Sequence, residues 1–304
     1  MALEVPSEEL RAALRAFAER SVGPIVALED RSRAFGRMSL VWRIETAGGR
    51  QYYLKRHEDR RLFDRERHAV LDWLPRLPEG ARQMTAPPTA IADDLDAMIF
   101  EAAPGEIVEE ADLTREERLA AYQLAGAFAA ALHALPCDGC GPAAGYGATL
   151  LESVERWLGD PQAAFSVEVQ EWVRDEVRAG GAFEGVSLVP AHMDYSPRNW
   201  LLHRDGGVLW LHVIDWERAR PAPWVEDVQR MAEDHWHADP TLREAFFLGY
   251  GREPSEVEER QIRALVVVNG AVGAIAWGGQ RGDSAFVAKG RAILERLRAE
   301  TEER

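Results

Sequence analysis

The sequence predicts an α+β fold, with a small β-rich N-terminal lobe over residues 1–103 and a larger, mainly helical C-terminal lobe over 104–304. Short apolar runs separated by turn residues fill residues 25–55, which is typical of strands. After Gly105 the apolar residues recur mainly at helical spacing. A second group of short strand signals at 187–214 predicts one hairpin within the helical lobe.

The N-terminal lobe contains helix signals beside its strands. Ser7 is a suitable N-cap for a helix whose apolar residues share one face. The turn Ala47-Gly48-Gly49 separates two strand patterns and therefore predicts a β-hairpin. The predicted elements are a helix at 7–20, strands at 40–44 and 51–54, a helix at 62–74, a buried strand at 97–100 and a linker at 101–105.

The C-terminal lobe has apolar residues at helical spacing in three long segments. A loop rich in Gly and Pro separates the first two segments, and the predicted hairpin separates the last two. The predicted elements are helical segments at 113–135, 149–179 and 224–299, a loop at 136–148, and strands at 187–190, 200–202 and 208–214.

Composition and charge narrow the possible classes of protein. The chain is 46% hydrophobic and 29% charged, which is ordinary for a globular protein. Its formal net charge is −15, and such a field repels nucleic acids and attracts cations. We therefore expect no nucleic-acid partner, and the charge fits a cationic small molecule. A negative charge that only keeps the protein soluble explains the same value equally well.

The N-terminus is acidic and amphipathic and lacks the charged-then-apolar pattern of a signal peptide. The longest apolar stretch, Leu265–Trp277, is interrupted by Asn269 and Gly270 and is short for a membrane span. We therefore expect a cytoplasmic protein without a membrane partner, either monomeric or homodimeric.

Cysteine and lysine are both rare. Cys137 and Cys140 form an isolated C-x-x-C in a loop, without a second ligand pair for zinc, and we expect two loop thiols. Lys55 and Lys289 are the only lysines among 36 basic residues. Because Arg fills the other cationic positions, each lysine is informative.

The strongest functional signal is the pattern H-x-D-x-x-x-x-N over 192–199, followed by Asp215 at the end of a predicted strand. Phosphoryl transfer needs a carboxylate beside the acceptor hydroxyl and Mg²⁺ on the phosphate oxygens. Asp194 could take the hydroxyl proton, while Asn199 and Asp215 offer the oxygen ligands that Mg²⁺ prefers. His192 would hold the loop by hydrogen bonds. A chance match in a polar loop is the alternative, and the hairpin that follows disfavours it.

This segment resembles the catalytic loop and metal-binding strand of aminoglycoside phosphotransferases and related small-molecule kinases. In that family the motifs read H-G-D-x-x-x-x-N and I-D-[WF]; here Met193 stands in place of the Gly, and the hairpin before Asp215 is longer. The resemblance implies a bilobal protein-kinase-like fold. Trp216-Glu217 replaces the Phe-Gly of protein kinases, which favours the small-molecule branch. The resemblance also implies that Asp227 braces the catalytic loop.

The same resemblance makes demands on the N-terminal lobe. A kinase-type lobe needs a strand Lys for the nucleotide phosphates, a helix Glu that holds this Lys, and a loop that covers the phosphates. Lys55 follows a strand pattern, and Glu66 matches the family's R-E-x-x-x-L helix, with Glu58 as the competing candidate. The phosphate loop would lie at 35–39, with Ser39 touching phosphate.

The linker resembles the hinge that binds the nucleotide base in this family. Phe100 would border the base, and the Glu101 carbonyl and the Ala103 amide would meet its edge. The resemblance therefore implies ATP or GTP together with Mg²⁺. Family substrates include aminoglycosides, macrolides, cationic peptide antibiotics, choline, homoserine and sugars.

Acids lie beside aromatic residues in the C-terminal lobe, which suits a cationic acceptor. The candidate acceptor residues are Glu233, Asp234, Trp236 and Trp277. Their alternative interpretation is solvated helix acids and core tryptophans.

Three hypotheses follow. The first is a Mg²⁺-dependent antibiotic O-phosphotransferase that confers resistance, and the second is a metabolic kinase of the choline, homoserine or sugar type. The third, a non-catalytic kinase-like binding protein, is disfavoured because Lys55, Asp194, Asn199 and Asp215 are all present. A P-loop enzyme is excluded because no G-x-x-x-x-G-K-[ST] motif occurs.

Overall fold

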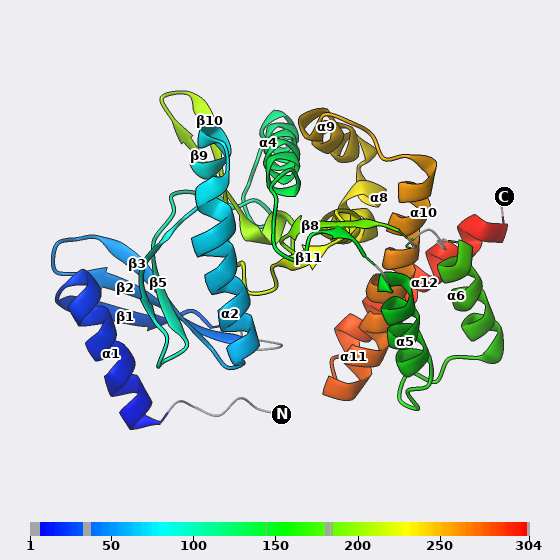
Figure 1. Ribbon diagram of the computed structural model, residues 1–304, viewed down its shortest axis with the longest axis horizontal. Helices are drawn as coiled ribbons and strands as arrows, with labels where there is room; N and C mark the ends of the chain where they lie inside the picture. Colours follow the sequence, from blue (N-terminus) through cyan, green and yellow to red (C-terminus); the bar gives the residue numbers. More distant parts are fainter. Residues whose placement is uncertain (1–6, 33–37, 144, 180–182, 184, 303–304) are drawn as a thin grey trace. The chain divides into compact units, whose positions relative to one another are not determined.

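The computed structural model describes residues 7–32, 38–143, 145–179, 183 and 185–302 (Figure 1). The chain forms two compact units, with unit 1 made of residues 1–117 and 197–220, and unit 2 made of 118–196 and 221–304. The antiparallel sheet in the N-terminal part and the helical C-terminal part confirm the predicted α+β class.

The predicted boundary at residues 103–104 differs from this division. Strand β6 (Glu106–Ile107) pairs with β9 (Trp200–Asp205), and β9 pairs with β10 (Val208–Val213). This three-stranded sheet therefore attaches the hairpin to the N-terminal part of the chain. The hairpin itself was predicted correctly from its strand patterns and turn.

Unit 1 is built on a five-stranded antiparallel sheet in the order β1-β2-β3-β5-β4. Helix α1 (Glu8–Val22) begins at Ser7, whose hydroxyl accepts from the Leu10 N–H. Its buried residues Leu14 and Phe17 pack in one apolar cluster with strand residues including Leu54. The strands are β1 (Ile25–Asp30), β2 (Ser39–Thr46), β3 (Gln51–His57), β4 (Pro88–Ala92) and β5 (Ala97–Glu101).

Alternation along β3 gives the sheet two different faces. Tyr52 and Leu54 belong to the apolar cluster that α1 covers. Lys55 and His57 are also buried, and both contact Glu66 of α2 (Arg60–His68). Tyr52 and Leu54 of β3 therefore belong to the apolar core, whereas Lys55 and His57 form polar contacts with α2. After α2 come η1 (Ala69–Trp73), η2 (Leu74–Arg76) and α3 (Glu79–Arg82).

Unit 2 is mainly helical, as predicted. Helix α4 (Arg115–His133), which begins in unit 1, and α9 (Pro240–Tyr250) approach closely at Gly126 and Gly249, where an added Cβ would overlap the facing backbone. The remaining helices are α5 (Tyr146–Leu158), α6 (Val167–Ala179), α7 (Val225–Arg230), η4 (Met231–His235), α8 (Trp236–Ala238), α10 (Glu256–Leu265), η5 (Val266–Gly273), α11 (Ala274–Arg281) and α12 (Ser284–Glu302). The short strands are β7 (Gly141–Pro142), β8 (Ser187–Ala191) and β11 (Arg220–Ala222).

The segment Glu256–Arg281 is one continuous helix. It is the one candidate among the described residues whose length and apolar composition would allow a membrane crossing, and 78% of its apolar window is buried inside the structure. Such burial is typical of a core helix. It contains the interrupted apolar stretch Leu265–Trp277.

The expectation of two loop thiols is wrong. The backbone N–H of Cys140 donates to the Cys137 carbonyl at 3.1 Å, so a tight turn brings the two residues together. Their Cα atoms lie 5.2 Å apart, and the sulfur atoms form a disulfide.

Candidate functional site

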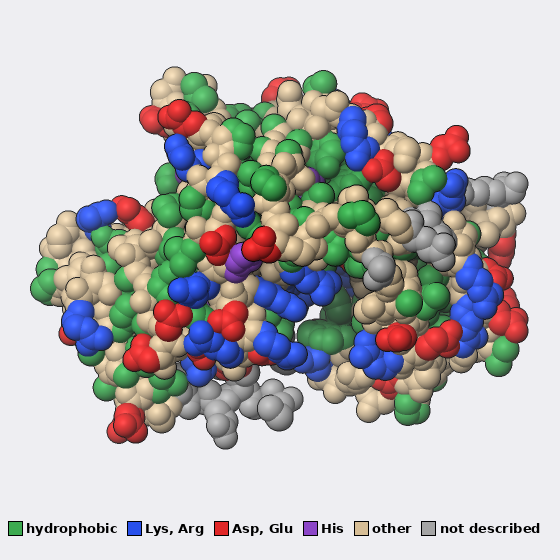
Figure 2. Space-filling view, in the orientation of Figure 1, with side chains coloured by type: hydrophobic (Ala, Val, Ile, Leu, Met, Phe, Trp, Pro, Cys, Tyr) green, Lys and Arg blue, Asp and Glu red, His purple; other side chains and the backbone are tan. Residues whose placement is uncertain are grey.

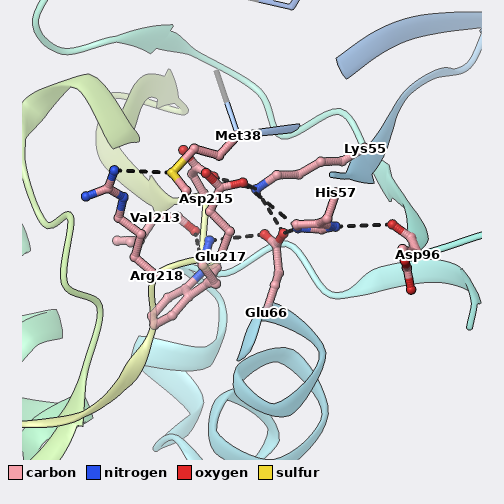
Figure 3. A network of polar contacts seen from close by, with 10 residues as sticks. Met38, Lys55, His57, Glu66, Asp96, Val213, Asp215, Glu217 and Arg218 are labelled. Carbon is pink, nitrogen blue, oxygen red and sulfur yellow. Dashed lines mark hydrogen bonds and ion pairs between the residues drawn. The ribbon is translucent and has the colours of Figure 1, made fainter. Parts of the chain in front are cut away.

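Lys55 lies at the centre of a buried charge network in unit 1 (Figure 3). Its Nζ is 2.8 Å from Oε2 of Glu66, 2.5 Å from Oδ1 of Asp215 and 3.1 Å from Oε2 of Glu217. The contact with Glu217 has an ion-pair distance without hydrogen-bond geometry. The predicted Lys–Glu pair is therefore present, and it involves Glu66 rather than Glu58.

The surroundings of Lys55 control the ionisation of the network. Burial alone lowers the pKa of Lys55, but Asp215, Glu66 and Glu217 raise it well above its ordinary value. Burial likewise opposes ionisation of Glu66, yet Lys55 and His57 lower the pKa of that carboxyl to about 2. Lys55 therefore remains an ammonium and Glu66 a carboxylate at neutral pH.

His57 is a member of the network that was not predicted from the sequence. It lies two residues after Lys55 on the same side of β3, and its ring is fully buried. Its Nε2 is 2.6 Å from Oε2 of Glu66, and its Nδ1 is 3.3 Å from the Asp96 carbonyl. His57 thus contacts one oxygen of the Glu66 carboxylate, and the backbone N–H of Trp216 donates to the other, Oε1, at 3.1 Å.

The two predicted metal ligands belong to neighbouring segments of unit 1. The N–H of Ile214 donates to the Asn199 carbonyl at 3.0 Å, and Val213 pairs with Trp200 in the hairpin. The backbone therefore aligns Asn199 with the residue before Asp215. An amide and a carboxylate are donors that suit Mg²⁺, so these two residues fit that ion by their chemistry.

The predicted phosphate loop at 35–39 lies mostly outside the described residues. Ser39, its last residue, is buried at the start of β2 and pairs with His57 across the strands. The strand register therefore places Ser39 two residues from the position opposite Lys55.

The predicted hinge follows β5. Phe100 pairs with Tyr53, and Glu101 pairs with Tyr52 in the sheet. The Glu101 side chain is exposed and binds Arg50 at 2.8 Å, so any contact with a base would come from its backbone. The N–H of Ala103 donates to no acceptor within the described parts of the chain.

The predicted catalytic loop is held by Asp227 in unit 2. Asp227 is fully buried; its Oδ2 accepts from the His192 N–H at 2.9 Å, and its Oδ1 accepts from the Met193 N–H at 2.6 Å. The Nε2 of His133 lies 3.0 Å from the same Oδ2. Asp227 therefore fixes the backbone immediately before Asp194, which is the contact that the resemblance implied.

The substitution of Gly by Met at position 193 occurs at an unusual backbone position. Met193 has φ 66°, in the left-handed region that glycine adopts without steric cost. Asp215 also has a left-handed φ, of 71°. The loop therefore has a backbone conformation that suits glycine, and this conformation is strained at Met193.

Arg230 contacts the predicted catalytic carboxylate. Its Nε lies 2.8 Å from Oδ1 of Asp194, whose side chain is only 8% exposed. Arg230 ends the same short helix, α7, that contains Asp227. One helix thus holds both the backbone and the carboxylate of the loop.

The predicted acceptor residues differ in their surroundings. Trp236 is buried and packs against Phe246 and Phe247 with ring centroids 5.7 and 5.3 Å apart, so it contributes to the core of unit 2 instead of to a substrate surface. Trp277 stacks on Arg281 and contacts Phe286.

Glu233 and Asp234 both contact Lys289. The Nζ of Lys289 is 2.5 Å from Oδ2 of Asp234 and 3.7 Å from Oε2 of Glu233. The acids proposed for a cationic acceptor therefore already have a cationic partner.

Local charge in unit 1 differs from the acidic average. Figure 2 shows Lys and Arg side chains gathered over the lower part of α2. This helix contains Arg60, Arg61, Arg65 and Arg67. The net charge of the chain is therefore a poor guide to the charge of any one site.

Several residues of the network were not predicted from the sequence. His57 and Glu217 each lie two residues from a predicted site residue, and Arg230 lies three after Asp227, so their spacing gave a weak signal. His133 had none, because its partner Asp227 lies 94 residues away. Only the folded chain brings them together.

Comparison with known proteins gives a consistent result. Residues 32–262 match the profile of the phosphotransferase enzyme family. No curated protein sequence matches the chain. The fold is similar to that of APH(2″)-IIIa in its complex with GDP and kanamycin, with 15% identity, a TM-score of 0.75 and coverage of 95% of this chain and 99% of that chain.

Two further solved structures have the same fold. The gentamicin complex of APH(2″)-IIa has 17% identity and a TM-score of 0.70, covering 96% of this chain and 97% of that chain. The macrolide 2′-phosphotransferase MphH from Brachybacterium faecium has 16% identity and a TM-score of 0.66, covering 95% of this chain and 98% of that chain.

Proposed function

The chain belongs to the phosphotransferase enzyme family, and from this premise we propose that it transfers the γ-phosphate of ATP or GTP to a hydroxyl group of a small molecule. The observation that carries the proposal is the buried contact of Lys55 with Glu66 and Asp215. A strand lysine held by a helix glutamate is what phosphoryl transfer on a kinase-type lobe requires.

The chemistry of each site residue suggests its role in the proposed reaction. Lys55 would bind phosphate oxygens, and Asn199 and Asp215 would hold Mg²⁺, which neutralises charge on those oxygens. Asp194 would accept the hydroxyl proton while the acceptor oxygen bonds to the γ-phosphorus. The bond to the β,γ-bridging oxygen then breaks, and the nucleoside diphosphate leaves. Asp227 and Arg230 would hold Asp194 in place during this step.

The acceptor class has two candidates. An antibiotic is supported by the family and by the solved relatives, whose structures include kanamycin and gentamicin complexes. A metabolic hydroxyl compound without a strong positive charge is supported by the pairing of Glu233 and Asp234 with Lys289. A non-catalytic binding protein is disfavoured, because the chain contains the four expected site residues Lys55, Asp194, Asn199 and Asp215.

The proposal is tested by acceptor-dependent nucleotide consumption. Purified protein is assayed with ATP or GTP and Mg²⁺ against kanamycin, gentamicin, a macrolide, choline, homoserine and glucose. We expect consumption with at least one acceptor, abolished by chelation of Mg²⁺ and by Asp194→Asn. The matched control is Asp205→Asn, which makes the same chemical change at an exposed hairpin residue and should leave activity intact. Consumption that survives Asp194→Asn would refute the assignment of this residue.

A further inference from the structure

Lys289 is the only lysine of unit 2, and the proposed reaction gives it no role. It lies on α12, and its side chain is 36% exposed. Its ammonium contacts two consecutive acids, Asp234 at 2.5 Å and Glu233 at 3.7 Å. The same arrangement of two carboxylates around one ammonium is how a protein would bind an amino group of a ligand.

The Glu233 carboxylate is built into the protein. Its side chain is only 5% exposed, and Gln229 donates a hydrogen bond to its Oε1. Gln229 in turn accepts from Asn269 at 3.4 Å. A Cβ at position 270 would lie 2.6 Å from Oε1 of Glu233, so a larger residue there would displace this carboxylate from its present position. Asp234, by contrast, is 43% exposed.

This acid pair lies close along one helix to Arg230, the residue that contacts the predicted catalytic carboxylate. Segment η4 continues α7 without a break, and Glu233 follows Arg230 by three residues. Residues three apart are neighbours on a helix surface. Because Arg230 contacts Asp194, the acid pair lies about one helical turn from the group that holds the catalytic carboxylate. The local π-helical winding of η4 is a feature often found at functional sites.

We propose that Lys289 determines acceptor specificity: its ammonium fills the place that Glu233 and Asp234 would otherwise offer to an ammonium group of the acceptor. This proposal rests on the proposed function, since it places the acceptor beside Asp194. The acceptor is then a hydroxyl compound without an ammonium group at that position. A ligand ammonium entering the site meets the like charge of Lys289, whereas a neutral ligand does not.

The test is calorimetric binding of kanamycin, a polyamine with many hydroxyls, in the presence of Mg²⁺ and a non-hydrolysable nucleotide. It is run at pH 8, because burial raises the pKa of Glu233 to about 7 and the carboxylate must be ionised. Lys289→Met removes the ammonium and keeps the length of the side chain. We expect at least a ten-fold gain in affinity for kanamycin, with no gain for Lys289→Arg.

The matched control is Arg291→Met, on the exposed side of the same helix. It removes the same unit of charge without touching the acid pair, and we expect less than a two-fold change. The double variant Lys289→Met with Glu233→Gln should lose most of the gain. Circular dichroism and the melting temperature verify that each variant is folded.

The outcomes separate this inference from the proposed function. An unchanged or weaker affinity for kanamycin in Lys289→Met, including no detectable binding in either form, overturns the inference. An equal gain in Arg291→Met also overturns it, since the effect would then be long-range charge. If the gain occurs but no acceptor stimulates nucleotide consumption, the ammonium site stands and the proposed reaction fails.

Discussion

The two lysines of the chain lie in contrasting surroundings. Lys55 in unit 1 is 9% exposed and has three carboxylates within 3.1 Å of its ammonium. Lys289 in unit 2 is 36% exposed and has one carboxylate at 2.5 Å and a second at 3.7 Å. A buried ammonium among several acids cannot leave without exposing uncompensated charge, whereas a half-exposed one can be replaced by water or by a ligand.

The largest expected effect is on stability, and it differs between the two lysines. Lys55→Met leaves buried carboxylates without their cation, and breaking a buried pair costs roughly 3–5 kcal/mol. Lys289→Met should cost less than about 1 kcal/mol, because its environment is partly solvated. Urea denaturation of both variants gives the two free energies of unfolding. Equal losses would show that burial does not distinguish the two sites.

Lys55→Met should also weaken the use of nucleotide, while Lys289→Met should not. Lys55 is proposed to bind phosphate oxygens, whereas the ammonium of Lys289 contacts Asp234 and Glu233. Steady-state kinetics measures kcat/KM for ATP and GTP with an accepted substrate. An unchanged value for Lys55→Met would remove this residue from the nucleotide site.

The carboxylates beside the two lysines differ in how their contribution to stability depends on pH. Lys55 and His57 lower the pKa of Glu66 to about 2, so its stabilising contribution is present above about 4.5 and is lost as the pH falls toward 2. Burial raises the pKa of Glu233 to about 7. The folded protein therefore binds the Glu233 proton more tightly, and the contribution of this group to stability falls as the pH rises from about 4.5 to 7.

Glu233→Gln removes that second dependence. We expect the variant to gain stability relative to the wild type between pH 4.5 and 7. The gain is about 3 kcal/mol at most, because the pKa rises from 4.5 to about 7 and each pKa unit corresponds to about 1.4 kcal/mol. Chemical denaturation at pH 5, 6, 7 and 8 measures the difference. Parallel stability profiles for the two proteins would contradict the role of burial at Glu233. Glu295→Gln, at an exposed position of α12, is the control.

Sequence patterns predicted local structure well, because each signal lies within a few residues. The N-cap Ser7, the Gly-rich turn at 47–49 and the hairpin around Asp205 each specify their own element. The pair Pro87-Pro88 is by itself a loop signal, yet Pro88 begins β4, an edge strand where a missing N–H is tolerated.

The site was predicted only where a motif has fixed spacing. Asp194, Asn199 and Asp215 follow such a motif, and Lys55 with Glu66 follows another. The pairing of Arg230 with Asp194 and of Lys289 with Glu233 joins segments far apart in the chain, so no local pattern carries it. Trp236 looked like a ligand-binding aromatic because helical spacing does not distinguish a core face from a substrate face.

The smallest expected effect concerns the catalytic loop itself. Met193 has a left-handed φ of 66°, which costs a residue with a side chain about 1–2 kcal/mol. Met193→Gly removes this strain but adds freedom to the unfolded chain, so we expect a net stabilisation of no more than about 1 kcal/mol. Thermal unfolding measures it, and a clear loss of stability would mean that the Met side chain supplies packing that outweighs the strain.

The most direct test of the proposed phosphotransfer compares two aspartates by calorimetry and turnover. Asp194→Asn should keep Mg²⁺-dependent binding of a non-hydrolysable nucleotide and lose turnover by about 10²–10⁴-fold, the scale for a positioned general base. Asp215→Asn should lose both, because it removes the charged metal ligand. Loss of metal-dependent binding in Asp194→Asn with retention in Asp215→Asn would reverse the two roles, and full turnover in both variants would contradict the phosphotransfer mechanism.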